Sequence, residues 1–161
     1  MSSRKFSFAH LFVISLALSG ITTYATAEES FHGTWVLNLE KSKFDPGPPP
    51  KSQTRTMSVE GDMQTTLIET VNAKGESTSS RSSYRFDGKD YPVEGSGEID
   101  SIAFKKMDSN TSRGVLKRQG KVVAEVTRKV SADGRTLTLT SKGTNPQGQP
   151  TNNVTVFDRK K

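Results

Sequence analysis

Apolar and polar residues alternate along most of the chain. Trp35, Leu37 and Leu39 share one face of a segment, and Leu137 and Leu139 alternate with threonines in another. Successive side chains of a β-strand point to opposite faces, so this period of two predicts antiparallel strands with one buried and one solvated side. The sequence contains no stretch with the apolar spacing of an amphipathic helix.

Turn residues separate these segments at short intervals, as at Asp87-Gly88, which reads as a two-residue hairpin turn, and at Asp133-Gly134. The segment from 121 to 131 has an apolar face of Val122, Ala124, Val126 and Val130. We expect strands over 33–40, 52–60, 63–72, 77–87, 89–93, 98–107, 111–118, 121–131, 135–142 and 151–159. Short strands joined by hairpin turns predict an all-β fold, a single antiparallel meander β-barrel of about eight to ten strands that closes to remove its edges.

Two segments depart from this pattern. Residues 44–50 are rich in proline and predict a stiff extended connection between the first two strands. Residues 77–83 are polar on both faces, which favours an edge strand or a loose hairpin arm.

The N-terminal residues 1–27 are typical of a secretory signal peptide. Arg4 and Lys5 precede an apolar run over 11–21, and Ala25-Thr26-Ala27 fits a cleavage site. We therefore expect a domain over 28–161 that is exported to the periplasm or secreted. The alternative is an uncleaved membrane anchor. Because the chain has no second apolar run, we expect no membrane insertion after cleavage.

Composition narrows the chemistry. The chain has no cysteine, which excludes disulfides, thiolate metal ligands, a cysteine nucleophile and a lipoprotein anchor. Its net charge is +6, but no basic run is interleaved with aromatic residues, so we expect no nucleic-acid partner. Hydrophobic residues make up only 31% of the chain. The core must therefore contain few apolar side chains. Either it is loosely filled, or it includes polar groups and water.

Candidate catalytic groups are sparse. His32 is the one histidine outside the signal peptide, so no two-histidine metal site is available, and there is no Gly-x-Ser-x-Gly motif. We expect no catalytic residue, metal or cofactor. The densest polar cluster, at 87–92, is most simply a turn followed by an edge strand, and a site for a cation or polar ligand is the alternative.

Aromatic residues at inward positions are the candidate ligand-binding residues. Tyr84 and Phe86 share a face, and Phe104 and Phe157 lie on two later strands. An aromatic-lined cavity suits a small hydrophobic or amphipathic ligand. The alternative is that these rings fill the barrel, which would then serve as an envelope protein-interaction or structural module, with a protein partner that the sequence does not identify.

The segment Phe31–Leu37, followed by 43–45, resembles the opening of intracellular fatty-acid-binding proteins and, more distantly, of lipocalins, both calycins. The resemblance implies that Trp35 closes one end of the barrel and that a basic side chain of the last strand lies over its ring. Arg159 is the candidate, because a guanidinium over an indole is a favourable cation–π contact. The alternative places Arg159 in a solvated tail.

The chain also departs from that family. Residues 46–50 stand where a helical lid would be, and Thr155 and Phe157 stand where an Arg-x-Tyr pair would hold a ligand carboxylate. We therefore do not expect fatty-acid binding in that mode.

The whole of 28–161 also resembles small exported bacterial proteins with lipocalin-like domains. The resemblance rests on the segments 33–35, 41–48, 87–93 and 143–149. The resemblance implies a lipocalin-like fold and export of the protein, and it implies no activity.

Overall fold

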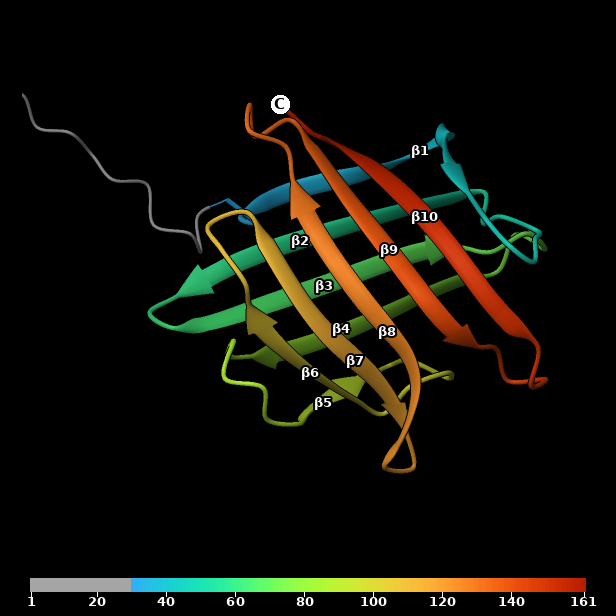
Figure 1. Ribbon diagram of the computed structural model, residues 1–161. Coiled ribbons are helices and arrows are strands. Elements are labelled where there is room, and N and C mark those ends of the chain that lie inside the picture. Colours follow the sequence, from blue (N-terminus) through green and yellow to red (C-terminus); the bar gives the residue numbers. More distant parts are fainter. Residues whose placement is uncertain (1–29) are drawn as a thin grey trace, which may run out of the picture.

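The computed structural model describes residues 30–161, which form ten strands and no helix (Figure 1). The predicted signal peptide lies outside the described residues and remains an expectation. In the part of the chain that is described, no helix is long and apolar enough to cross a membrane. The strands are β1 (Gly33–Lys43), β2 (Ser52–Glu60), β3 (Met63–Val71), β4 (Ser77–Tyr84), β5 (Tyr91–Glu94), β6 (Ser101–Lys106), β7 (Thr111–Arg118), β8 (Lys121–Val130), β9 (Thr136–Thr144) and β10 (Pro150–Arg159).

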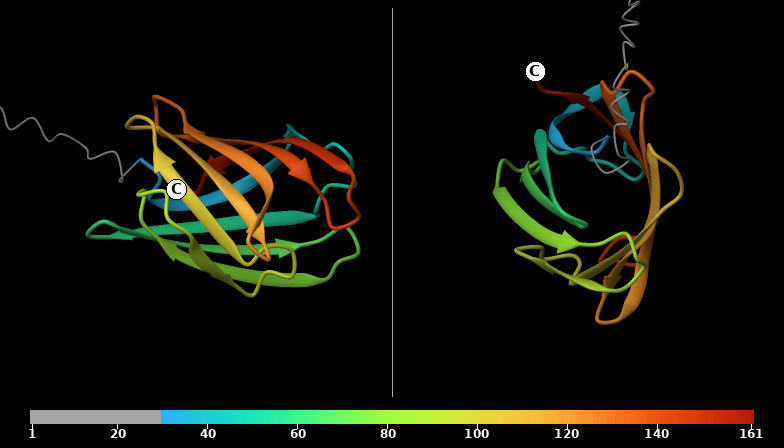
Figure 2. Two further views of the ribbon diagram at one scale, coloured as in Figure 1. Left: turned by 60° about the horizontal axis from the view of Figure 1, so that its bottom comes forward. Right: turned by 90° about the vertical axis from the view of Figure 1, so that its left-hand side faces the viewer.

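The strands form one closed antiparallel barrel, which confirms the predicted meander. Each strand pairs with its neighbours in sequence, and β10 pairs with β1 to close the ring (Figure 2). At the closing seam Trp35 lies opposite Arg159 on β10 and opposite Arg55 on β2. Every strand therefore has two partners, and the pairing is shortest at β5, which pairs with β4 and with β6 at two positions each.

The expectation that residues 77–83 form an edge strand or a loose arm is wrong. They belong to β4, which pairs with β3 from Ser77 to Tyr84 and with β5 at Arg81 and Ser82. A closed barrel can accept such a polar strand because small hydroxyl side chains fit on both of its faces. Ser82 is buried inside, and the Ser83 hydroxyl lies 2.8 Å from that of Thr65 on β3.

The predicted two-residue turn at Asp87-Gly88 is also wrong. The connection between β4 and β5 spans residues 85–90. The amide of Gly88 donates to the carbonyl of Phe104 at 2.9 Å. The backbone of Asp87 also pairs with that of Lys105 on β6 in an isolated antiparallel β-bridge. The connection lies along β6 because Phe86 packs inward, with its ring 5.7 Å from that of Tyr84.

The interior is filled unevenly along its length. Large buried side chains gather toward one end in a cluster of Phe31, Trp35, Met57, Val130, Leu137, Leu139 and Phe157, and a second cluster holds Tyr84, Ile102, Phe104 and Val126. Further along the same inward faces the side chains are small or polar and only half-buried, at Thr70, Ser80, Ser141, Gly143 and Thr155. The small proportion of hydrophobic residues thus corresponds to a barrel interior with an apolar end and a polar end.

One glycine fixes the position of a central aromatic ring. Gly114 on β7 lies beside Phe104, and a Cβ added there would approach the Phe104 ring to 2.4 Å and the carbonyl oxygen of Ala103 to 2.3 Å. The missing side chain therefore lets the ring lie flat against the neighbouring strand.

Candidate ligand-binding interior

A buried arginine stands at the centre of the aromatic residues. Arg128 lies on the inward face of β8 between Val126 and Val130, and it is 3% exposed. Its guanidinium carbon lies 3.8 Å from the centroid of the Phe104 ring. It also lies within 5.5 Å of the rings of Phe31, Tyr84 and Phe86. Such cation–π contacts stabilise a desolvated guanidinium more than an exposed one.

Hydrogen bonds satisfy only part of this guanidinium. Arg128 Nη1 donates to the Tyr84 hydroxyl at 2.6 Å, and Nε donates to the Ser112 hydroxyl at 3.0 Å. The third nitrogen, Nη2, is buried and has no partner. Nearby, Gln64 Nε2 donates to the same Tyr84 hydroxyl at 2.8 Å, while Gln64 Oε1 is buried without a partner. A buried donor that carries charge and lacks an acceptor is costly, so an acceptor placed beside this nitrogen would stabilise it.

A second arginine points into the barrel from β2. Arg55 Nε donates to Gln53 Oε1 at 3.1 Å, and its guanidinium carbon lies 5.1 Å from the centroid of the Phe157 ring. The side chain is half-buried, so some of its surface still reaches water. Desolvation, and after it the positive charge of Arg128, lower the pKa of Arg55 to about 10. Arg55 therefore stays charged at neutral pH, in surroundings that disfavour the charge.

No carboxylate offsets these two charges. Within residues 30–161 every Asp and Glu is exposed except Asp158, which is half-buried. Asp158 accepts from Asn38 Nδ2 at 2.7 Å and pairs with Lys41 at 3.1 Å, so it is committed elsewhere. The described interior thus holds two guanidinium groups and no acidic partner.

The predicted ligand-binding aromatics divide between these two arginines. Tyr84, Phe86 and Phe104 come together around Arg128, with the Tyr84 and Phe104 rings 5.6 Å apart. Phe157 belongs to the other cluster and faces Arg55. The four residues therefore lie in two adjoining clusters, and Phe86 packs against both.

Arg159 lies over Trp35, with its guanidinium carbon 4.1 Å from the indole centroid. Its Nε donates to the Gly134 carbonyl at 2.6 Å, Nη2 donates to the Ser30 carbonyl at 2.8 Å, and Nη1 donates to the His32 carbonyl. Burial lowers the pKa of Arg159. Each of the three nitrogens has a backbone acceptor, so these hydrogen bonds hold Arg159 across the end of the barrel.

Gly33 makes room for this seal. Its φ of +117° belongs to the region that favours glycine, and a Cβ there would lie 2.7 Å from Nη1 of Arg159. Trp35 itself is completely buried and donates from Nε1 to the Phe31 carbonyl at 2.9 Å.

The arginines inside the barrel were missed in the sequence, although a signal for one of them is present. The alternation that places Val126 and Val130 on the inward face also places Arg128 there. Thr155 and Phe157 on β10, where the resemblance to fatty-acid-binding proteins implies a carboxylate clamp, are half-buried and buried respectively. The interior charge of this chain instead comes from β2 and β8.

The polar cluster at 87–92 is paired within itself and with β7. Asp87 accepts from the Tyr91 hydroxyl at 3.0 Å and lies 3.8 Å from Lys89 Nζ, while Asp90 accepts from Lys117 Nζ at 2.7 Å. The turn geometry and neighbouring charges lower the pKa of Asp87, chiefly through the backbone amide of Lys89. Among residues 30–161 no group of three or more histidine or acidic side chains is placed to hold a metal ion.

Comparison with known proteins yields fold-level likeness only. No protein-family model matches the chain, and no curated protein matches it. A redesigned β-barrel, mFAP1 bound to DFHBI, is similar at 11% identity over 84% of this chain and 100% of its own, with a TM-score of 0.45. The zebrafish ileal bile acid-binding protein complexed with cholic acid is similar at 13% identity over 81% of this chain and 99% of its own, with a TM-score of 0.49. The chemistry of the interior rests on this chain's own residues.

Proposed function

We propose that this barrel is an exported binding protein that holds a small amphipathic molecule by an anionic group inside the barrel. The observation that carries the proposal is the unpartnered Nη2 of Arg128, a charged donor with 3% exposure of its side chain and no carboxylate facing it. Removing a charge from water without a counter-charge is costly, and a bound anion offsets that cost.

The surroundings of Arg128 fix the position of its guanidinium. Tyr84 and Ser112 hold two of its nitrogens, and the Phe104 ring holds its plane, so the free nitrogen is fixed before a ligand arrives. A pre-positioned donor loses little conformational entropy on binding. Charge-assisted hydrogen bonds to a carboxylate, sulfonate or phosphate are also stronger than neutral ones.

The aromatic and apolar residues of the interior would contact the apolar part of the ligand. The rings beside Arg128 and Arg55 give the apolar part of an amphipathic ligand a surface to pack against. The half-buried polar positions, such as Thr70 and Ser141, lie at the end that the large side chains leave unfilled. This is the end through which a ligand would enter.

The test uses 1-anilinonaphthalene-8-sulfonate, an anionic fluorescent amphiphile, and N-phenyl-1-naphthylamine, an uncharged molecule of similar shape. We expect the purified domain to bind the sulfonate at least about tenfold more tightly, which corresponds to about 1.4 kcal/mol. Arg128→Met should remove that preference while leaving binding of the amine in place. Arg81→Met on the exposed side of β4 is the matched control, and it should change neither affinity.

Equal binding of the two probes to the unmodified protein would contradict the proposal, as would a sulfonate affinity that survives Arg128→Met. Thermal unfolding of each variant separates loss of binding from loss of fold. Export is tested separately, by mass measurement of the N-terminus in the native host. We expect cleavage before Glu28.

A further inference from the structure

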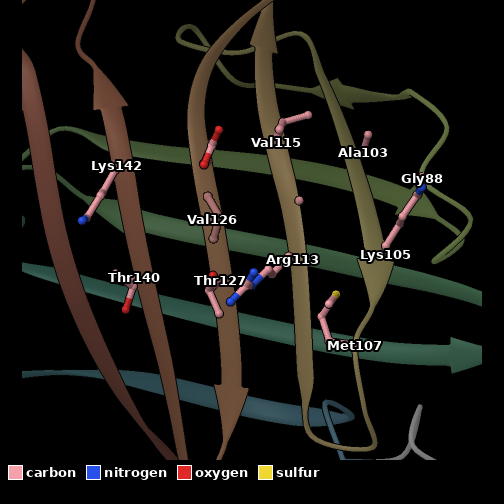
Figure 3. A pocket seen from close by; sticks show the side chains of 12 residues that line it. Gly88, Ala103, Lys105, Met107, Arg113, Val115, Val126, Thr127, Thr140 and Lys142 are labelled. Carbon is pink, nitrogen blue, oxygen red and sulfur yellow. The ribbon is translucent and has the colours of Figure 1, made fainter.

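A groove of about 480 Å³ crosses the outer surface of β6, β7, β8 and β9 (Figure 3). Its lining includes Ala103, Lys105 and Glu125. The chain neighbours of these residues, Phe104 and Val126, are buried in the interior cluster. Since side chains alternate between the two faces of a strand, the groove lies outside the barrel and is separate from the interior arginines.

Like charges face each other in this groove. Lys105 on β6 lies directly opposite Arg113 on β7 in the strand register, and both are exposed. Neither side chain makes a salt bridge or a side-chain hydrogen bond within residues 30–161. Like charges directly opposite each other on one face of a sheet are destabilising, and an anion between them removes the repulsion. This cross-strand pair is therefore suited to a carboxylate from outside the chain.

The conformation of Lys105 depends on the β4–β5 connection. A Cβ added to Gly88 would lie 2.3 Å from Lys105 Cε, so the glycine lets the lysine stem lie against the connection. A lysine whose stem is packed in this way loses less freedom when its amino group binds an anion.

The rest of the lining is mixed. Half-buried Val115, with buried Ala103 opposite it in the register, forms an apolar patch beside the cationic pair, and Met107 is 56% exposed at its edge. Glu125 lies opposite Lys142 in the register of β8 and β9, so the groove carries three cations and one carboxylate. Thr127 lies opposite Arg113, and Thr140 lies opposite Thr127, so their side chains continue the row of the cationic pair and offer neutral hydrogen-bonding groups.

We infer that this groove binds an acidic peptide segment of a partner protein, a segment in which carboxylate and apolar side chains alternate. Carboxylates would meet Lys105 and Arg113, and an apolar side chain would cover Ala103 and Val115. A uniformly charged polyanion fits less well, because it gains nothing from the apolar patch and is repelled by Glu125. The open shape of the groove favours an extended chain over a small molecule that must be enclosed.

The test is a ¹⁵N NMR titration of the domain with the peptide acetyl-Glu-Leu-Glu-Leu-Glu-Leu-amide. We expect saturable shifts of amides on β6 to β9 that weaken as salt is raised. Lys105→Glu combined with Arg113→Glu should lower the affinity at least about tenfold, because the peptide carboxylates then meet like charges. Lys74→Glu, in the exposed turn between β3 and β4, is the control and should bind as the unmodified protein does.

Two further titrations determine the class of partner. A peptide with lysine in place of glutamate should not bind, and heparin should bind more weakly than the acidic peptide at equal ionic strength. Tighter binding of heparin would overturn the inference in favour of a polyanion. It would equally be overturned if the shifts fell on the interior residues or if the double variant kept full affinity while its circular dichroism was unchanged.

Discussion

Arg128 and Tyr84 are joined across the inside of the barrel by a hydrogen bond of 2.6 Å from Nη1 to the phenol oxygen. The two residues come from β8 and β4, which are not neighbours in the sheet. The same phenol oxygen accepts from Gln64 Nε2 on β3 at 2.8 Å. One hydroxyl thus links three strands and holds a buried charge in place.

Tyr84→Phe should destabilise the fold by about 1–3 kcal/mol, because Arg128 Nη1 loses its acceptor and Gln64 Nε2 keeps only Thr66 Oγ1 at 3.3 Å, while the ring packing remains. Urea unfolding followed by the fluorescence of Trp35 measures the change. Tyr91→Phe removes a half-buried tyrosine's hydroxyl, whose partner is the surface residue Asp87, and should cost less than about 1 kcal/mol. Equal effects of the two variants would mean that the hydroxyl of Tyr84 carries no special role.

Arg55→Met should leave the ligand-free protein as stable as before, or more stable by about 1 kcal/mol, while it weakens sulfonate binding. The substitution removes a charge that is desolvated and repelled by Arg128, the causes that lower its pKa to about 10. Measuring both the free energy of unfolding and the affinity for the sulfonate probe tests whether the substitution keeps stability while it weakens binding. A large loss of stability would show that the fold needs the charge.

Gly114→Ala should destabilise the barrel by about 1–3 kcal/mol, because the new methyl group meets both the Phe104 ring and the Ala103 carbonyl. The ring supports the Arg128 guanidinium, so probe affinity should fall as well. Gly97→Ala is the matched control, since a Cβ there meets nothing within 4 Å and the residue has no positive φ. The control variant should unfold at the same urea concentration as the original.

Asp158 should contribute stability that depends on pH. The hydrogen bond from Asn38, and after it the one from Lys41, lower the pKa of this carboxyl. The contribution is therefore fully present above the unfolded-state pKa of about 3.9 and is lost as pH falls through the lower folded-state pKa. Asp158 is half-exposed, so we expect less than about 1 kcal/mol.

Comparing urea unfolding of the original protein and Asp158→Asn at pH 7 and pH 2.5 measures this contribution. The difference between the two proteins should be largest at pH 7 and shrink in acid. A difference that is the same at both pH values would exclude the charged form as its source.

The strand pattern could be predicted from the sequence because alternation and turn residues are local signals. Closure of β1 onto β10 followed from the physical cost of leaving edges open, and the position of Arg128 was implied by its neighbours Val126 and Val130. The absence of an acidic partner for Arg128 could not be predicted, because it depends on which residues of distant strands share the interior. The connection at 85–90 was misread for a similar reason, since its path is set by Phe86 packing onto Tyr84 and not by its own turn residues.

The seam between the first and last strands has a consequence for how the protein must mature. Trp35 is buried by Arg159, so its environment is completed only by the final residues of β10. Contacts of such high sequence separation form late and slowly. Closure of the ring therefore waits until β10 has been made and has paired with β1. The fluorescence of the single tryptophan would report the moment at which the ring closes.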